Sequence, residues 1–234
     1  MVRCTLICML VCVAVSLAAV PEPRQTAKKE SSRQDWFIDP SGRAGAIRRT
    51  ATRADLVRTY GPGNVQDGPM DIGEGETVPA TFLFPSDPKR RIAIFWENDA
   101  RSKGSVRVQI DGDASLWHTT GGITLGTPLK KLEQLNGRPF MLEGFNWDYS
   151  GTVTSWRGGK LDSAFEPRDH SWRVVLRLSP VYADPNHVMS PAEQELIGER
   201  EFHSSHPEMQ KLNPVVYQIL WLFQSGDRPP GAAR

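Results

Sequence analysis

The sequence predicts an α+β protein of two tandem units, each a short helix packed on an antiparallel β-sheet, followed by a C-terminal helical segment and a final strand. Three observations predict this class. Residues 45–64, "GAIRRTATRADLVRTYGPGN", recur in looser form as residues 121–140, "GGITLGTPLKKLEQLNGRPF". Each copy has start and stop signals for a short helix. Each copy is followed by segments in which apolar and polar residues alternate, as in half-buried strands.

Aligned without gaps, the two copies superpose several apolar and glycine positions. The matched pairs are Gly45 with Gly121, Ile47 with Ile123, Leu56 with Leu132 and Gly61 with Gly137. Two turns of helix are too short to be stable alone in water, so each helix must pack on the strands that follow it. We therefore place the first unit at residues 36–119 and the second at residues 120–182.

The chain begins with a segment typical of a secretory signal. Arg3 precedes an apolar run from Cys4 to Val15, and small residues near Ala18 and Ala19 suit a signal peptidase. The run is short for a membrane span, so residues 1–19 are expected to be a cleaved signal peptide, with a retained anchor as the alternative. The mature protein would then be exported, periplasmic or secreted, with no stable membrane insertion. Polar residues 20–35 are expected to be a flexible linker.

Composition excludes several classes of function. The three cysteines all lie in the predicted signal peptide, so the mature chain would have no thiol, disulfide or cysteine metal ligand. The chain has 28 basic and 27 acidic residues. This balance gives no broad field that would attract nucleic acid or anionic lipid, so we expect no nucleic-acid partner.

The helix of the first copy is expected to start at Thr52 and end at Gly61. Thr52 and Asp55 have the spacing of a capping box, and the buried side would carry Leu56, Val57 and Tyr60. In the second copy Thr127 is the expected cap, with Pro128 at the first helical position. A stripe of Leu129, Leu132 and Leu135 would be buried, and Asn136-Gly137 would stop the helix.

The strands expected after the first copy are "TVPATFLF" (77–84), "RRIAIFW" (90–96), "SVRVQI" (105–110) and "SLWHTT" (115–120). After the second copy they are "RPFMLEGFNWDY" (138–149), "TVTSWRG" (152–158) and "SWRVVLRL" (171–178). The turns between the last three are expected at Ser150-Gly151 and at Arg157-Gly158-Gly159.

Residues 183–223 are expected to add helices and a strand that pack across both units. Ser190 to Glu193 and Ser205 to Glu208 both have capping-box spacing with a proline at the first helical position. The apolar segment 215–223 fits a helix or a strand. Its β-branched start after Pro214 favours a buried final strand. Residues 224–234 are expected to be a disordered tail.

The pattern "G-I-x-x-G-T-x-L-x-x-L-x-x-L-N-G" before a hairpin resembles the short-helix-plus-antiparallel-sheet repeat of the β-lactamase-inhibitory proteins and of small outer-membrane assembly lipoproteins. The resemblance covers about residues 44–180 in two copies. The mature chain departs from both groups because it lacks cysteines for disulfides or a lipid anchor. It is more similar to bacterial exported proteins with tandem α/β repeats. The resemblance implies a binding or scaffolding role and assigns no residue.

The stretch "GFNWDYSGTVTSW" (144–156) is the densest candidate site. Trp147, Tyr149 and Trp156 flank a predicted turn, with Asp148 between them. Aromatic rings beside a carboxylate provide stacking area and a directional acceptor for a sugar or a peptide. Alternatively, the rings fill the sheet face under the helix, and Asp148 binds turn amides.

No catalytic, cofactor or metal site is assigned. His203 and His206, near Glu199 and Glu201, lack an H-E-x-x-H arrangement, and a predicted helix boundary separates them. There is no G-x-S-x-G motif and no phosphate-binding loop, so we expect no cofactor, and an enzyme is less favoured than a binding protein.

The leading functional hypothesis is a non-enzymatic exported protein that binds another protein through an exposed sheet face, as an inhibitor or immunity protein would. One alternative is a carbohydrate- or cell-wall-binding module with or without weak hydrolase activity. Another is an envelope assembly factor. Two adjacent sheets would provide a face wide enough for a protein partner.

Overall fold

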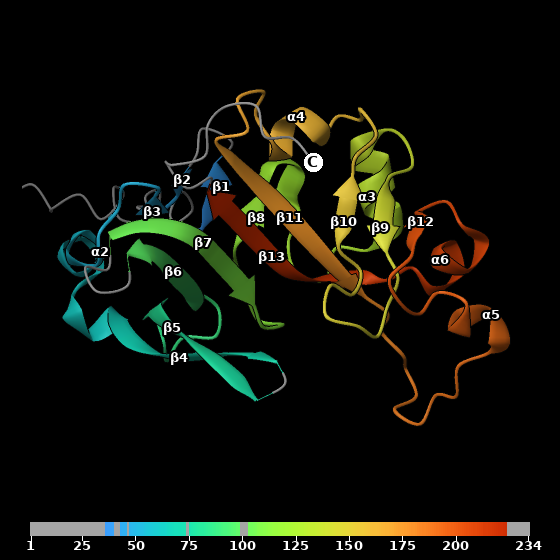
Figure 1. The fold of residues 1–234 in the computed structure, drawn as a ribbon, viewed down its shortest axis with the longest axis horizontal. Coiled ribbons are helices and arrows are strands. Elements are labelled where there is room, and N and C mark those ends of the chain that lie inside the picture. The colour runs from blue at the N-terminus through green and yellow to red at the C-terminus, as the bar shows by residue number, and fades with distance from the viewer. Residues whose placement is uncertain (1–35, 40–42, 46, 74, 99–102, 224–234) are drawn as a thin grey trace, which may run out of the picture.

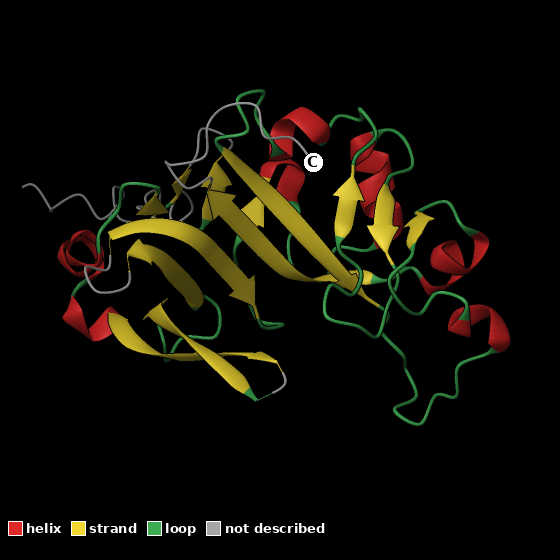
Figure 2. Ribbon diagram, in the orientation of Figure 1, coloured by secondary structure: helices red, strands yellow, loops and turns green. Residues whose placement is uncertain are grey.

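The computed structural model describes residues 36–39, 43–45, 47–73, 75–98 and 103–223 (Figure 1). The predicted signal peptide (1–19), linker (20–35) and tail (224–234) lie outside the described residues. The α+β class is confirmed: three β-sheets make up most of the regular structure, and the helices between them are short (Figure 2). In the described part of the chain, no helix is long and apolar enough to span a membrane.

The largest element is a six-stranded antiparallel sheet with the order β11-β13-β7-β6-β5-β4. Its strands are β4 (Val65–Gly73), β5 (Glu76–Leu83), β6 (Ile92–Asn98), β7 (Lys103–Asp111), β11 (Trp172–Ser179) and β13 (Val215–Phe223). A small sheet, β3-β2-β1-β8, contains β1 (Phe37–Asp39), β2 (Arg43–Ala44), β3 (Ile47–Arg48) and β8 (His118–Thr119). A third sheet, β10-β9-β12, contains β9 (Met141–Glu143), β10 (Val153–Ser155) and β12 (Glu201–His203).

The helices are short and lie at the edges of the molecule (Figure 1). They are α2 (Arg53–Tyr60), α3 (Leu129–Asn136), α4 (Asp162–Phe165), α5 (Pro191–Gln194) and α6 (Pro207–Leu212), with 3-10 turns η1 (Pro62–Asn64) and η3 (Thr120–Gly122). The helices α2, α3, α4 and α6 each place a buried hydrophobic residue in one continuous core. Tertiary packing therefore stabilises helices that are too short to persist alone.

Helix α2 has the predicted capping box. The Thr52 hydroxyl accepts a bond from the Asp55 amide at 3.2 Å, and the Asp55 carboxylate accepts one from the Thr52 amide at 2.9 Å. Bonds from the Thr52 hydroxyl and amide hold the pKa of Asp55 below its usual value. Leu56 is fully buried, while Val57 and Tyr60 pack against the core from half-buried positions.

Replacing the cap residue tests how much the capping box contributes to the stability of the protein. Thr52→Ala removes both hydroxyl bonds and should lower the free energy of unfolding by about 1 kcal/mol, the usual value of an N-cap. Urea denaturation measures the change. The matched control is Thr59→Ala, an exposed threonine in the last turn of the same helix, which should be near neutral. Equal effects of the two substitutions would contradict the capping assignment.

Helix α3 differs from the prediction at its start. Thr127 was the predicted cap, but the helix begins at Leu129 and Pro128 is its N-cap, with no side-chain bond. Thr127 instead joins the final strand: its carbonyl accepts from the Val216 amide at 2.9 Å, and its hydroxyl accepts from the Thr124 amide. The predicted end is confirmed, because Gly137 adopts the left-handed conformation that stops the helix.

The C-terminal helix signals have a mixed outcome. The capping box at Ser190 and Glu193 is present and starts α5. The second box is wrong by one residue: the cap of α6 is His206, not Ser205, because the His206 ring nitrogen accepts the Glu208 amide at 3.3 Å.

Most long predicted strands are confirmed, three are shorter than expected, and one strand was missed. Within segment 152–158, only Val153–Ser155 is a strand. The segment 215–223 is strand β13, as its β-branched start suggested. Only two residues of "SLWHTT" form a strand, and β8 pairs in parallel with β1, outside the large sheet. Only Met141–Glu143 of segment 138–149 is a strand, because the chain then enters a turn. Strand β4 was missed because Gly68 and Pro69 disfavour strands; Pro69 is tolerated since β4 is an edge strand.

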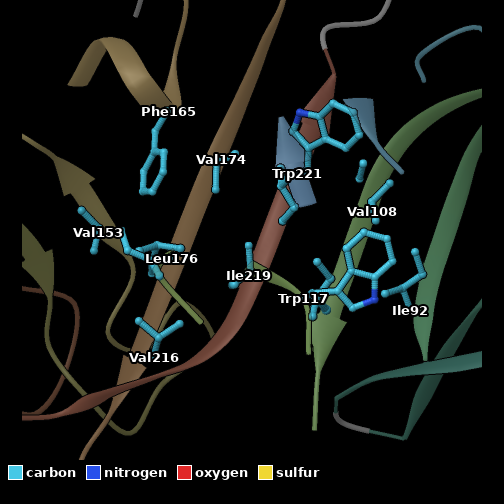
Figure 3. Packing of buried hydrophobic residues seen from close by; sticks show 14 of the residues in the cluster. Ile92, Val108, Trp117, Val153, Phe165, Val174, Leu176, Val216, Ile219 and Trp221 are labelled. Carbon is cyan, nitrogen blue, oxygen red and sulfur yellow. The ribbon is translucent and has the colours of Figure 1, made fainter. Parts of the chain in front are cut away.

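Strand β13 joins the parts of the molecule. It pairs with β11 on one side and with β7 on the other, so the large sheet combines strands from residues 36–119, 120–182 and 183–223. Figure 3 shows the core at this junction, where Val174, Trp221 and Val108 come from these three neighbouring strands. Each is at most 6% exposed. At about 1.5–3 kcal/mol for each large buried side chain, this junction contributes heavily to stability.

The two faces of the large sheet are different. The main core covers the face that carries Ile94, Val108 and Trp221. The opposite face carries Phe82, Ala93 and other residues of a second small cluster, to which only β4, β5 and β6 contribute within the described chain. Beyond that cluster, the opposite face carries arginines on β7 and β11.

Candidate functional site

The predicted aromatic residues lie around a tight turn at residues 144–151, called here the aromatic turn. The Gly151 amide donates to the Gly144 carbonyl at 2.9 Å, and the Ser150 amide donates to the Trp147 carbonyl at 3.0 Å. The Ser150 hydroxyl accepts from the Asn146 amide at 3.2 Å. These bonds close the turn at the base and hold its tip in one conformation.

Two of the predicted rings contact each other at the tip of this turn. Trp147 and Tyr149 meet edge to face with ring centroids 5.3 Å apart. The Trp147 indole NH donates to the Gly144 carbonyl at 3.1 Å, which fixes the half-buried ring. Tyr149 is 56% exposed, and Asp148 between them is exposed. An aromatic pair and the exposed Asp148 carboxylate thus lie together at the tip of the turn.

Trp156 lies apart from this surface. It is 7% exposed and packs between Phe140 and Phe165, with ring centroids at 5.0 and 5.4 Å. For Trp156, the alternative interpretation is therefore correct: its ring is part of the core. The turn places Trp147, Asp148 and Tyr149 together and leaves Trp156 in the core.

Two residues that sequence reasoning missed complete the surface. The Arg177 guanidinium lies 5.5 Å from the centre of the Tyr149 ring, and the Tyr217 hydroxyl donates to the Ser150 carbonyl at 3.5 Å. The strands hold this arrangement, because Thr152 forms a bridge with Arg177 and the Leu178 amide donates to the Gly151 carbonyl. Alternation in "SWRVVLRL" could have placed Arg177 on a polar face, but nothing local indicates its contact with Tyr149.

A pocket of about 180 Å³ lies beside the aromatic turn, between Asn146 and the loop that follows β11. Within it, the Tyr182 and His187 rings stack at 4.2 Å, and His187 Nε2 lies 3.1 Å from the Glu193 carboxylate. Hydrogen bonds from Ser190 and then the charge of His187 lower the pKa of Glu193. Burial and the nearby Glu193 raise the pKa of Tyr182. The pocket is large enough for one side chain of a partner.

No protein-family model, curated protein sequence or solved structure matches this chain.

The pocket does not assemble a nucleophile and a base. His187 bonds to Glu193, which already caps α5, while the Ser179 hydroxyl donates to the Pro180 carbonyl at 3.4 Å. Among the described residues, no serine hydroxyl is hydrogen-bonded to a histidine ring. A serine nucleophile that is activated by histidine would need that kind of contact.

The two histidines considered as metal ligands, His203 and His206, have separate places in the structure. His206 caps α6, and His203 is exposed on β12 opposite Met141. Nearby, Glu143 faces Glu201 across the small sheet, and burial together with the charges of Glu201 and Glu199 raises the pKa of Glu143. In the described ranges no three histidine, cysteine or acidic side chains are placed to hold a metal ion.

Exposed apolar residues gather at the aromatic turn and the segments beside it. Large exposed hydrophobic side chains in the described ranges are Ile72, Leu116, Tyr149, Val181, Tyr182, Val188 and Tyr217. All except Ile72 and Leu116 belong to the turn, to the loop after β11 or to β13. The pocket and the Tyr217 contact join these three segments. We call Trp147, Tyr149, Tyr182, Tyr217 and Arg177 the aromatic surface.

Proposed function

We propose that the protein is a non-enzymatic exported protein that binds another protein through the aromatic surface. The observation that carries the proposal is the contact of exposed Tyr149 with Arg177, beside Tyr217. Tryptophan, tyrosine and arginine are the residue types that contribute most to the affinity of protein interfaces. The adjacent pocket supports the proposal, because interface anchors commonly insert into such pockets. An inhibitor-like or immunity-like role is one form of this function.

We further propose that residues 45–64 and 121–140 arose by duplication. Several paired features support this. Helices α2 and α3 start and end at matched positions of the two copies. Ile47 and Ile123 are fully buried, as are Leu56 and Leu132. Gly45 and Gly121 both have positive φ, which favours glycine at both sites.

The proposed binding is tested by identifying the partner and then measuring its affinity. The mature chain is immobilised, retained envelope proteins are identified by mass spectrometry, and the purified candidate is titrated against the variants. Tyr149→Ala and Tyr217→Ala should each weaken binding at least tenfold, since both remove a ring from the contact surface. Leu116→Ala is the matched control, because Leu116 is 51% exposed but lies before β8, outside the aromatic surface.

Equal affinities of all three variants would contradict the proposed surface. A chain that binds purified peptidoglycan or glycans, with loss of binding in Trp147→Ala and Tyr149→Ala, would instead support the carbohydrate-binding alternative. The exposed Asp148 beside two rings is the observation that favours it. Co-purification with outer-membrane components would support the assembly-factor alternative.

A further inference from the structure

The face of the large sheet opposite the main core carries three arginines, one of which, Arg177, also belongs to the aromatic surface. The strand register places Arg107 opposite Leu222 and Leu222 opposite Arg173, so these side chains share a row across β7, β13 and β11. Arg177 lies farther along β11 on the same face, opposite Gln218. We call Arg107, Arg173 and Arg177 the arginine face.

The charges of this face are not neutralised by the described part of the protein. None of the three arginines forms an ion pair there, and the Nε atoms of Arg107 and Arg177 are shielded from solvent without a hydrogen-bond acceptor. The carboxylate of Asp111 on this face is engaged by Arg91 and Gln109. Burial, and then the charge of Arg177, lower the pKa of Arg107, and a carboxylate beside Arg107 would favour its charged form.

Two of the guanidinium groups lie against aromatic rings. Arg107 lies over the Phe95 ring at 3.7 Å, and Arg177 lies over the Tyr149 ring. A guanidinium that packs its flat face on a ring can still donate hydrogen bonds from its edge. Because the Nε atoms of Arg107 and Arg177 are shielded from solvent, a carboxylate would accept from their Nη atoms.

Apolar side chains separate the charged groups. Val175 and Leu220 are paired in the row that lies between Arg107 and Arg177. Because strands are about 4.8 Å apart, Arg107 and Arg173 are about 10 Å apart at the backbone. Along β11, Arg173 and Arg177 are four residues apart, about 13 Å, with Val175 between them. Carboxylates four residues apart on an extended peptide, with an apolar residue between them, have the same spacing. The formal net charge of +1 also provides no broad field for nucleic acid.

We propose that the arginine face binds a carboxylate-bearing extended segment of the protein partner. This inference rests on the proposed function, and it adds the chemistry of the partner. The acidic side chains bind Arg107, Arg173 and Arg177, and an intervening apolar side chain covers Val175 and Leu220. The aromatic turn then contacts the next part of the segment.

The test uses a fluorescein-labelled peptide that repeats Glu-Ser-Leu-Ser, and a control peptide that repeats Gln-Ser-Leu-Ser. Fluorescence anisotropy of the full chain should show at least tenfold tighter binding of the glutamate peptide at low salt, with weaker binding as salt increases. The double variant Arg107→Gln with Arg177→Gln should bind the glutamate peptide at least tenfold more weakly. The control double variant Arg157→Gln with Arg168→Gln changes two exposed arginines elsewhere and should keep the affinity.

Thermal unfolding of both double variants shows whether they are folded. Equal weakening by the two double variants would overturn the inference, because net charge alone would then explain binding. Failure of the glutamate peptide to bind would also overturn it. Arginine-dependent binding to phosphatidylglycerol vesicles but not to the peptide would also overturn it. A protein partner that needs Tyr149 but not Arg107 and Arg177 would leave the proposed function standing and refute this inference alone.

Discussion

Gly151→Ala is expected to lower the free energy of unfolding by more than about 4 kcal/mol, which is exceptional for one methyl group. A Cβ at this position would overlap the carbonyl oxygen of Leu178 and lie 2.7 Å from its carbonyl carbon. These are backbone atoms of strand β11, whose Leu178 amide donates to the Gly151 carbonyl at 2.9 Å. The clash therefore cannot be removed by a side-chain rotation. It would separate the aromatic turn from the large sheet.

The matched control is Gly112→Ala. Gly112 also has a positive φ, at 91°, but its Cβ would meet no atom within 4 Å. That variant should lose only about 1–2 kcal/mol, the cost of the left-handed conformation. Urea denaturation of both variants separates the backbone strain from the steric clash. If both variants unfold at the same urea concentration, the claim that Gly151 lies too close to β11 to accept a Cβ is wrong.

Asn136→Ala is expected to cost about 3 kcal/mol. The Asn136 side chain is 1% exposed and donates to the carbonyls of Arg138 and Trp156 at 2.9 and 3.0 Å. Its Oδ1 accepts from the Leu161 amide at 3.2 Å. Alanine would leave the Leu161 amide and the Arg138 carbonyl without this partner, while the Trp156 carbonyl would keep its bond from the Gly159 amide. A backbone group that loses its partner costs about 1–3 kcal/mol when it stays dry. The expected value is lower than the sum because water can enter part of the space.

The control for this variant is Gln134→Ala on the same helix. Gln134 is an exposed amide side chain, and alanine is the better helix former, so its substitution should be near neutral. Differential scanning calorimetry of both variants measures the difference. Gly159 supports the same contact, because a Cβ there would overlap the Asn136 amide. A neutral Asn136→Ala variant would refute the buried hydrogen-bond centre.

Much of the local structure could be predicted from sequence. The Thr52–Asp55 capping box, the stop at Gly137 and strand β13 follow from signals within a few residues of each element. The errors occur where tertiary contacts compete with local preference. Thr127 bonds to β13 instead of capping α3, and β4 forms despite Gly68 and Pro69 because β5 provides a partner along its length.

The candidate site was predicted only in part. Trp147, Asp148 and Tyr149 stand out because aromatic residues cluster around a recognisable turn. Composition alone cannot separate an exposed ring from a buried one, so Trp156 was grouped with them although it lies in the core. Arg177 and Tyr217 come from strands distant in sequence, and their contact with the turn depends on strand pairing.

The sequence by itself determined where α2, α3, α5 and α6 lie, the capping boxes of α2 and α5 and the two faces of the long strands, because caps and the two-residue period of a strand act between near neighbours. Only the tertiary structure decided which strands are neighbours. Burial of one common core places β13 between β7 and β11, makes Asn136 a buried hydrogen-bond centre and brings Arg177 to Tyr149. The alternation of a strand specifies which side chains share a face, but many partner strands satisfy the same alternation.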